Sequence, residues 1–283
     1  MNPEYRLSRI KSIISWVIAW FLAIFALFVA LLPFFFMVLN SFKDKFEMLT
    51  KGVFEFPDKF YVENYTEVLT GNFWHYFLNS VIVLGVSLVL LLAISAFASY
   101  PLSRFNFRLG KPIYAIIVAC MSIPVHVTLI PIFKMTQNMG IYDSIWALIG
   151  PNVALGIPIS VFILTSFMKE IPREIEESAE IDGCGKIGMF FRIIMPMAKP
   201  GLSTLAIYNG VNMWNEFIFA YSLTQSSANR TLPLAIWEYQ GQYTMNTPMI
   251  MAVLVLTALP MIILFIFASD RLVKGMTAGA VKG

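Results

Sequence analysis

The amino-acid sequence predicts an all-α integral membrane protein with six transmembrane helices. Both termini are expected in the cytoplasm, with a cytoplasmic helix-turn-helix loop between the fourth and fifth spans. The composition is the first reason, because 58% of the 283 residues are hydrophobic and 13% are charged, whereas about a quarter are charged in soluble domains. The mean hydropathy of +0.72 agrees. The second reason is the number of long apolar stretches, and the third is a polar loop with a helical period of its own.

Six apolar stretches are long enough to be transmembrane helices, since about 20 helical residues cross a hydrocarbon core of about 30 Å. They occupy residues 13–39, 77–100, 113–133, 145–167, 202–221 and 248–267. The chain, residues 1–283, is then one membrane domain with a polar loop at 168–201 and a C-terminal tail at 268–283. The first stretch exceeds the apolar core of a signal peptide, which indicates a retained span.

The basic residues predict the orientation. The segments before the first span and after the second, fourth and sixth spans hold 3, 3, 5 and 3 Lys and Arg residues, and the alternate segments hold 4, 1 and 1. This total of fourteen against six predicts that both termini are cytoplasmic. The external segment 40–76 is a weak exception, in which acidic residues outnumber the four basic ones. The net charge of +3 is spread over several loops and does not indicate nucleic-acid binding.

The polar loop predicts two short helices joined by glycines. Pro172 suits a first helical position, and the acidic residues that follow it suit the positive end of a helix dipole. Gly183 can end this helix, at about residue 182, in a left-handed conformation. The second helix has an apolar face with the spacing i, i+3, i+4, i+7, formed by Ile187, Phe190, Phe191 and Ile194. Periodicity alone equally allows an amphipathic hairpin that lies on the bilayer.

The residues of this loop resemble a known motif. The run Glu177-Ser-Ala-x-x-Asp-Gly183, followed by Ile193-x-x-Pro196, is similar to the Glu-Ala-Ala loop in permease subunits of ABC importers, with Ser178 in place of an alanine. The resemblance implies that the loop docks on an ATPase subunit. The residues expected in that contact are Glu177, Ser178, Ala179, Asp182 and Gly183.

The fifth span is the most polar, because Asn209, Asn212 and Glu216 recur at i, i+3 and i+7 with Asn215 at the border. Such a stripe is costly in lipid, so it either forms hydrogen bonds to another helix or lines a route for a polar solute. Both interpretations are open, and the second makes these four residues candidates for a translocation path. The prolines and Gly156 of the third and fourth spans indicate either interrupted helices along this path or ordinary tolerance of proline.

Two further stretches extend the resemblance. Trp214-Asn-Glu-Phe217 is similar to a signature of carbohydrate importer permeases, and Gly275-Met-Thr-Ala-Gly-Ala-Val-Lys-Gly283 resembles the end of permeases like the smaller membrane subunit of the maltose importer. The tail's glycines by themselves argue against a stable helix there. The resemblance implies a subunit of the prokaryotic cell membrane that pairs with a second permease as a heterodimer. The implied partners are two ABC ATPase subunits, an extracytoplasmic solute-binding protein and a sugar or oligosaccharide substrate.

Other functions are disfavoured by what the sequence lacks. There is no phosphate-cradling Gly-x-x-x-x-Gly-Lys-Ser/Thr loop, so any ATP is hydrolysed by another polypeptide and this chain is not an enzyme. Only Glu216 is charged within the predicted spans, which argues against an ion-coupled secondary transporter. Two histidines, His75 and His126, offer no metal site, and no cofactor is expected. Another organic solute, such as a glycerol phosphate, stays an alternative substrate.

Overall fold

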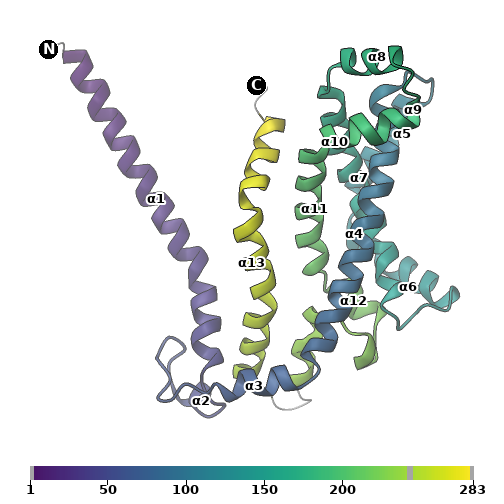
Figure 1. Cartoon of the computed structure of the whole chain (residues 1–283). Helices are drawn as coiled ribbons and strands as arrows, with labels where there is room; N and C mark the ends of the chain where they lie inside the picture. The colour runs from purple at the N-terminus through teal and green to yellow at the C-terminus, as the bar shows by residue number, and fades with distance from the viewer. Residues whose placement is uncertain (1–2, 241–244, 281–283) are drawn as a thin grey trace. The chain divides into compact units, whose positions relative to one another are not determined.

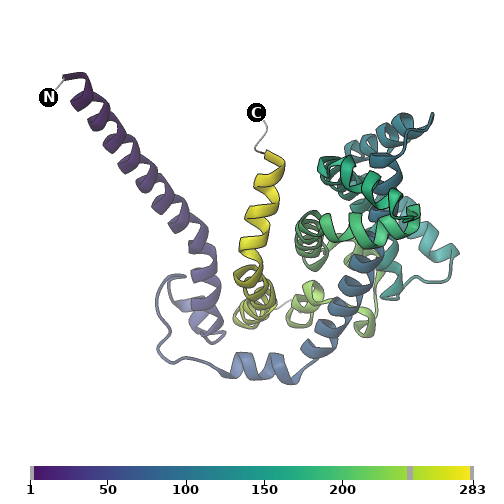
Figure 2. The same ribbon diagram turned by 45° about the horizontal axis from the view of Figure 1, so that its top comes forward.

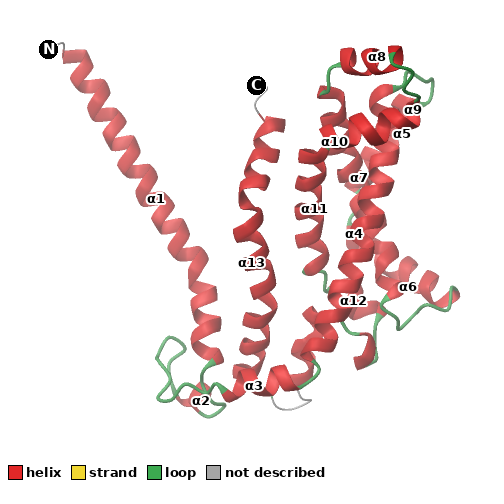
Figure 3. Ribbon diagram, viewed as in Figure 1, coloured by secondary structure: helices red, strands yellow, loops and turns green. Residues whose placement is uncertain are grey.

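The computed structural model describes residues 3–240 and 245–280, with the side chains of residues 13–240 and 245–267. Within these ranges the chain is helical, and the only β-type pairing is a single antiparallel bridge between Gln240 and Met245 (Figure 3). The chain forms two compact units. The first consists of residues 1–71 and 236–258, and the second of residues 72–235 and 259–283.

Four helices among the described residues are long and apolar enough to cross a membrane. They are α1 (Pro3–Ser41), α4 (Phe73–Arg104), α7 (Trp146–Glu170) and α13 (Thr247–Ala280), the first counted from Ile13 and the last to Phe267 (Figure 1). The pair α5 (Gly110–Ala119) and α6 (Leu129–Asn138) makes a fifth candidate, although its halves meet at 96°. The chain is therefore an integral membrane protein with four or five candidate spans.

The bend between α5 and α6 lies inside the predicted interval 113–133 and is caused by proline. The residue before Pro124, Ile123, is extended with φ −78° and ψ 118°, as the residue before a proline prefers. Two 3-10 turns flank this break, η1 (Cys120–Ser122) and η2 (Val125–Thr128). Helix α6 therefore points away from the packed helices of its unit in both views (Figures 1 and 2).

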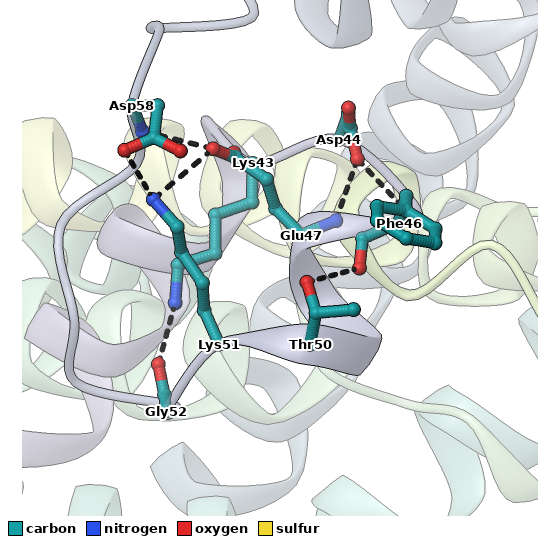
Figure 4. Close-up of polar contacts among 8 residues, drawn as sticks. All are labelled: Lys43, Asp44, Phe46, Glu47, Thr50, Lys51, Gly52 and Asp58. Carbon is teal, nitrogen blue, oxygen red and sulfur yellow. Dashed lines mark hydrogen bonds and ion pairs between the residues drawn. The ribbon is translucent and has the colours of Figure 1, made fainter.

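The first unit contains a compact loop after α1, in the stretch 42–70, which is rich in charged residues. Lys43 is completely buried there, and its Nζ donates a hydrogen bond to the carbonyl oxygen of Gly52 at 2.9 Å (Figure 4). Lys51 lies 2.6 Å from Asp58 and 3.4 Å from Glu47. One of the four lysines of this segment is therefore buried and another is paired with carboxylates, which fits the weak exception to the charge rule noted for residues 40–76. The loop also holds the short helices α2 (Glu47–Thr50) and α3 (Glu63–Thr70).

The second unit is built on the pair α4 and α7, and α11 (Lys199–Trp214) packs against both. One face of α4 carries three serines, Ser87, Ser95 and Ser99, all fully buried. The Ser99 hydroxyl donates to the carbonyl oxygen of Val161 on α7 at 3.4 Å. Small side chains allow membrane helices to approach closely, because association in lipid depends on packing and hydrogen bonds.

The polar loop between α7 and α11 forms a hairpin. It contains α8 (Arg173–Ile181), α9 (Lys186–Met189), the π-helical turn η3 (Phe190–Ile194) and α10 (Met195–Met197). The apolar face predicted for its second arm is half wrong, because Phe190 and Ile194 are buried whereas Ile187 and Phe191 are 77% and 55% exposed. A π turn holds more residues than an α turn, so the side chains of this arm do not follow the single face that an α-helical period predicts. Met189 takes the inward position and is fully buried.

The predicted interval 202–221 contains the end of one helix and the start of another. Helix α11 ends at Trp214, and α12 (Ile218–Leu223) follows after a break at residues 215–217. The turns η4 (Ser227–Asn229) and η5 (Leu232–Tyr239) come next. The Asn79 side-chain amide of α4 holds this stretch by donating to the carbonyl oxygens of Ala228 and Arg230 at 3.0 and 2.9 Å.

The C-terminal segment differs from the sequence prediction. The glycines argued against a stable helix after residue 267, but α13 continues to Ala280. A glycine costs about 1 kcal/mol in a helix interior, and a helix already nucleated in an apolar span can bear that cost because only propagation is needed. The last part of the predicted tail, residues 281–283, lies outside the described residues.

Candidate functional site

The first arm of the hairpin, α8, begins and ends within one residue of the predicted positions. Pro172 precedes it with φ −57° and ψ 137°, and Glu174 and Glu176 lie in its first turn. Gly183 has a φ of +81°, which confirms the left-handed conformation. The Gly183 amide donates to the Glu180 carbonyl at 3.0 Å and the Cys184 amide to the Ala179 carbonyl at 2.9 Å. This pair of bonds is a Schellman motif, which ends a helix and turns the chain sharply.

The residues expected in ATPase docking lie together on this arm. Glu177, Ser178, Asp182 and Gly183 are exposed, and Ala179 is half-buried against the core of the second unit. Two isoleucines next to them are also exposed, Ile181 by 87% and Ile187 by 77%. Large apolar side chains that project from a polar hairpin are typical of a contact surface. The sequence analysis missed Ile181, although an isoleucine between acidic residues was a visible signal.

Arg104 is the most constrained polar residue at the base of the hairpin. It is the last residue of α4, its side chain is 3% exposed, and both terminal nitrogens donate to the Ile171 carbonyl at 3.0 Å. Its Nε lies 3.0 Å from Glu176 Oε1 on α8. Sequence reasoning counted Arg104 only as a loop charge and missed this contact.

A cavity of about 300 Å³ with a lining of both polar and apolar side chains lies within the second unit, between α7, α11 and the start of α12. Three of the four path candidates line it, namely Asn209, Asn212 and Glu216. Asn215 does not line it and donates instead to the Val211 carbonyl at 2.8 Å. The sequence analysis missed two polar members of the lining, Asn152 and Tyr208. Asn152 had a signal, because it is a lone amide in an apolar span.

Asn209 combines a position in the cavity lining with hydrogen bonds to a neighbouring helix. It lines the cavity, and its amide also donates to Ser160 Oγ on α7 and to the Leu205 carbonyl, both at 3.0 Å. Gly156 on α7 makes this close approach possible, since a Cβ there would lie 2.8 Å from Leu91 and 3.0 Å from Asn209 Oδ1. Helices α4, α7 and α11 therefore meet at one wall of the cavity.

Glu216 is held by the backbone of the helix that follows it. Its Oε1 accepts a hydrogen bond from the Phe219 amide at 2.7 Å, and its Oε2 accepts one from the Ala220 amide at 3.0 Å. These amides would otherwise have no partner at the start of α12. The carboxylate thus fixes the break after α11 and keeps the cavity wall in place.

The described residues hold no group of three or more His, Cys, Asp or Glu side chains that could bind a metal ion. Cys120 and Cys184 are free thiols.

Apolar helices that could span a membrane, a cavity lined by polar and apolar side chains, and an exposed hairpin at the helix ends fit a membrane transport component. The chain belongs to the family of binding-protein-dependent transport system inner membrane components, whose model matches residues 89–278. Members of this family are transporter subunits that lie in the membrane, and this chain is accordingly a permease subunit rather than an enzyme.

Curated relatives cover nearly the whole chain. A putative ABC transporter permease protein, ORF2, from Caldicellulosiruptor sp. (strain Rt8B.4) is 48% identical over 277 residues, which are 98% of this chain and 100% of that protein. The melibiose/raffinose/stachyose import permease protein MelC from Bacillus subtilis is 31% identical, over 89% of this chain and 91% of that protein. The sulfoquinovosyl glycerol transport system permease protein SmoH from Agrobacterium fabrum is 36% identical, over 89% of each.

A solved structure shares the fold. A chain of a bacterial ABC transporter involved in the import of the acidic polysaccharide alginate superposes with a TM-score of 0.81 at 20% sequence identity. The match covers 93% of this chain and 97% of that chain.

Proposed function

We propose that this chain is a membrane-spanning subunit of an ATP-driven importer for a neutral sugar or oligosaccharide. It forms the translocation pathway with a second permease, receives the solute from an extracytoplasmic binding protein, and is driven by two ATPase subunits. Family membership and relatives named for the import of melibiose, raffinose and stachyose support this proposal. The observation that carries it is the hairpin, which presents the exposed acidic and apolar residues of α8 beside a Schellman turn.

The proposed topology has six spans with both termini in the cytoplasm. Helices α1, α4, α7 and α13 are four of them, the bent pair α5 and α6 is another, and α11 with α12 completes the set. The 16 residues of α11 extend for about 24 Å at 1.5 Å per residue, so α12 is needed to reach the far side. The distribution of basic residues supports this orientation, in which the hairpin is cytoplasmic.

The docking contact is proposed on α8. Glu177 pairs with a basic side chain of the ATPase, and Ser178 and Ala179 allow close packing because they are small. Asp182 and Gly183 form the turn that lets the hairpin enter a cleft. Since Ile181 is 87% exposed, it gives this contact an apolar centre, which interfaces need more than additional charge.

The cavity supports a neutral solute over an anionic one. Its described lining holds three asparagines, a tyrosine and one glutamate, with no lysine or arginine. Amide and phenol groups exchange hydrogen bonds with sugar hydroxyls, whereas a phosphate or carboxylate would have no counter-charge within the membrane. A glycerol phosphate is therefore the weaker alternative.

Co-purification tests the proposal. The chain is expressed with its partner permease and ATPase, extracted in mild detergent, and compared with Glu177→Lys. We expect Glu177→Lys to lose the ATPase while the two permeases stay together. Glu170→Lys is the control, because it makes the same charge change at an exposed position outside α8. Equal ATPase recovery from both variants would remove α8 as the docking site.

Uptake measurements test the substrate class. Reconstituted importer is supplied in turn with a neutral trisaccharide and an acidic oligosaccharide, each with a cognate binding protein. ATP-dependent uptake of the neutral sugar is expected. Uptake driven by an ion gradient without ATP would contradict the importer assignment, and preference for the acidic sugar would contradict only the substrate class.

A further inference from the structure

We infer that Arg104 is the positioning residue that makes the docking helix α8 move together with α4 and α7, and so links the ATPase to the cavity of the second unit. This inference rests on the proposed function, because it assumes that α8 receives the force of ATP-driven closure. It adds a residue outside the hairpin to the coupling machinery.

Arg104 joins the ends of three helices. It is the last residue of α4, and its two terminal nitrogens donate to the carbonyl of Ile171, the residue that caps α7. The end of a helix leaves such carbonyls without a partner inside the helix. The third contact is Nε with Glu176 Oε1 at 3.0 Å, in the first turn of α8.

The chemistry of the group makes this link stiff. A guanidinium is planar and always charged, so its terminal nitrogens can bind a carbonyl in fixed geometry while its charge attracts a carboxylate. The contact between Arg104 Nε and Glu176 Oε1 is an ion pair without hydrogen-bond geometry. Arg104 and Glu176 are both largely buried, with side chains 3% and 15% exposed. Separation of α8 from α4 would leave a buried charge unpaired, which is strongly unfavourable.

Apart from this link, α8 is held by a short connection to α7 and by the packing of Ala179 against the core of the second unit. Only Ile171 and Pro172 lie between Glu170, which ends α7, and Arg173, which begins α8. A second contact from the same turn of α4 supports the link, because the Tyr100 hydroxyl donates to the Lys186 carbonyl of the second arm at 3.1 Å. The last turn of α4 therefore holds both arms of the hairpin.

The same helices lead to the cavity. Helix α4 packs along α7, and α11 packs against both. They meet where Gly156 leaves no room for a side chain between Leu91 and Asn209, and where Asn209 donates to Ser160. A displacement of α8 that Arg104 passes to α4 and α7 thus reaches the wall formed by Asn209.

Chemical labelling in the cavity tests the inference without knowledge of the solute. Asn212→Cys is placed in a chain that carries Cys120→Ser and Cys184→Ser, and the complex with partner permease and ATPase is treated with N-ethylmaleimide. The labelling rate is measured without nucleotide and with ATP plus orthovanadate. We expect these rates to differ at least about fivefold in the otherwise native complex, the lower end of couplings between distant sites.

Two variants and a control decide the role of Arg104. Arg104→Lys keeps the charge but cannot make all three contacts, and Glu176→Gln removes the ion pair with almost no change in shape. Both are expected to keep the ATPase bound while the ratio of labelling rates falls toward one. Arg108→Lys makes the same substitution in an exposed loop and is expected to keep the native ratio.

The outcomes separate this inference from the function on which it rests. The role of Arg104 is overturned if both Arg104→Lys and Glu176→Gln bind the ATPase and keep the native ratio of labelling rates. The importer assignment would then remain intact. If Arg104→Lys fails to assemble, Glu176→Gln alone decides. A native complex that does not bind the ATPase overturns the proposed function, and this inference with it.

Discussion

The turn at Gly183 offers a sharp test of the hairpin, because its cost can be worked out from the backbone alone. A Cβ added at this position would meet no atom within 4 Å, so a substitution introduces no clash. The φ of +81° is unfavourable for any residue with a Cβ, by about 1–2 kcal/mol. One or two kcal/mol changes a population ratio by a factor of about 5–30. Gly183→Ser should therefore open the Schellman turn that much more often.

A matched control lies two residues away. Gly185 also has open space around its Cβ position, but its φ is −71° and it caps α9. Serine is a favoured residue at such a cap, so Gly185→Ser is expected to leave the hairpin unchanged.

Hydrogen exchange and ATPase recovery are the assays. In Gly183→Ser, the amides of residues 183 and 184, which form the two bonds of the turn, are expected to exchange about 5–30 times faster. Less ATPase should co-purify with this variant than with Gly185→Ser. Equal exchange and equal ATPase recovery in the two variants would refute the reasoning that the left-handed turn shapes the docking surface.

Three further predictions concern the cavity, the break after α11 and the loop after α12. Gly156→Ala is expected to destabilise the complex by about 1–3 kcal/mol, because the added methyl group overpacks against Leu91. Thermal unfolding measures this loss, and Gly150→Ala is the control, since a Cβ there would meet nothing within 4 Å. Glu216→Ala should cost about 0.5–2 kcal/mol because the amides at the start of α12 lose their acceptors, and a melting temperature equal to that of the native chain would contradict this. Burial raises the pKa of Asp143, but hydrogen bonds from Gln225 and Ser226 outweigh it and hold the pKa below its usual value. A lowered folded pKa stabilises the loop above the unfolded pKa of about 3.9 and loses that effect as the pH falls through the folded pKa. Cleavage of the loop after α12 by an acid protease should accelerate in that window, and Asp143→Asn should remove the acceleration.

The hairpin shows how far local sequence rules reach. Proline, acidic residues and glycine act through the nearest backbone, so the ends of α8 were predicted to within a residue and Gly183 was predicted in its observed conformation. The second arm was predicted less well, because the π turn at Phe190–Ile194 depends on packing against α4. No periodicity reveals such a turn in advance.

The partners of single polar residues were beyond sequence reasoning. Arg104 counts only as a basic loop residue when the positive charges are summed, and its contact with Ile171, 67 positions later, depends on how α4 and α7 pack. Asn209 and Asn212 were predicted because they repeat along one helix, whereas Glu216 of the same predicted stripe lies in the break after α11. Asn152 and Tyr208 complete the cavity from positions that no repeat connects to it.

The buried serines of α4 also bear on how the protein is made. Ser87, Ser95 and Ser99 are enclosed in the finished structure, with α7 supplying the acceptor for Ser99. Synthesis runs from the N-terminus, so α4 enters the bilayer before α7, which begins at Trp146, has been translated. During that interval its serine face meets lipid or the insertion machinery instead of a helix. The helices of the second unit are therefore assembled in order, because the serine face of α4 is covered only after α7 has been synthesised and inserted.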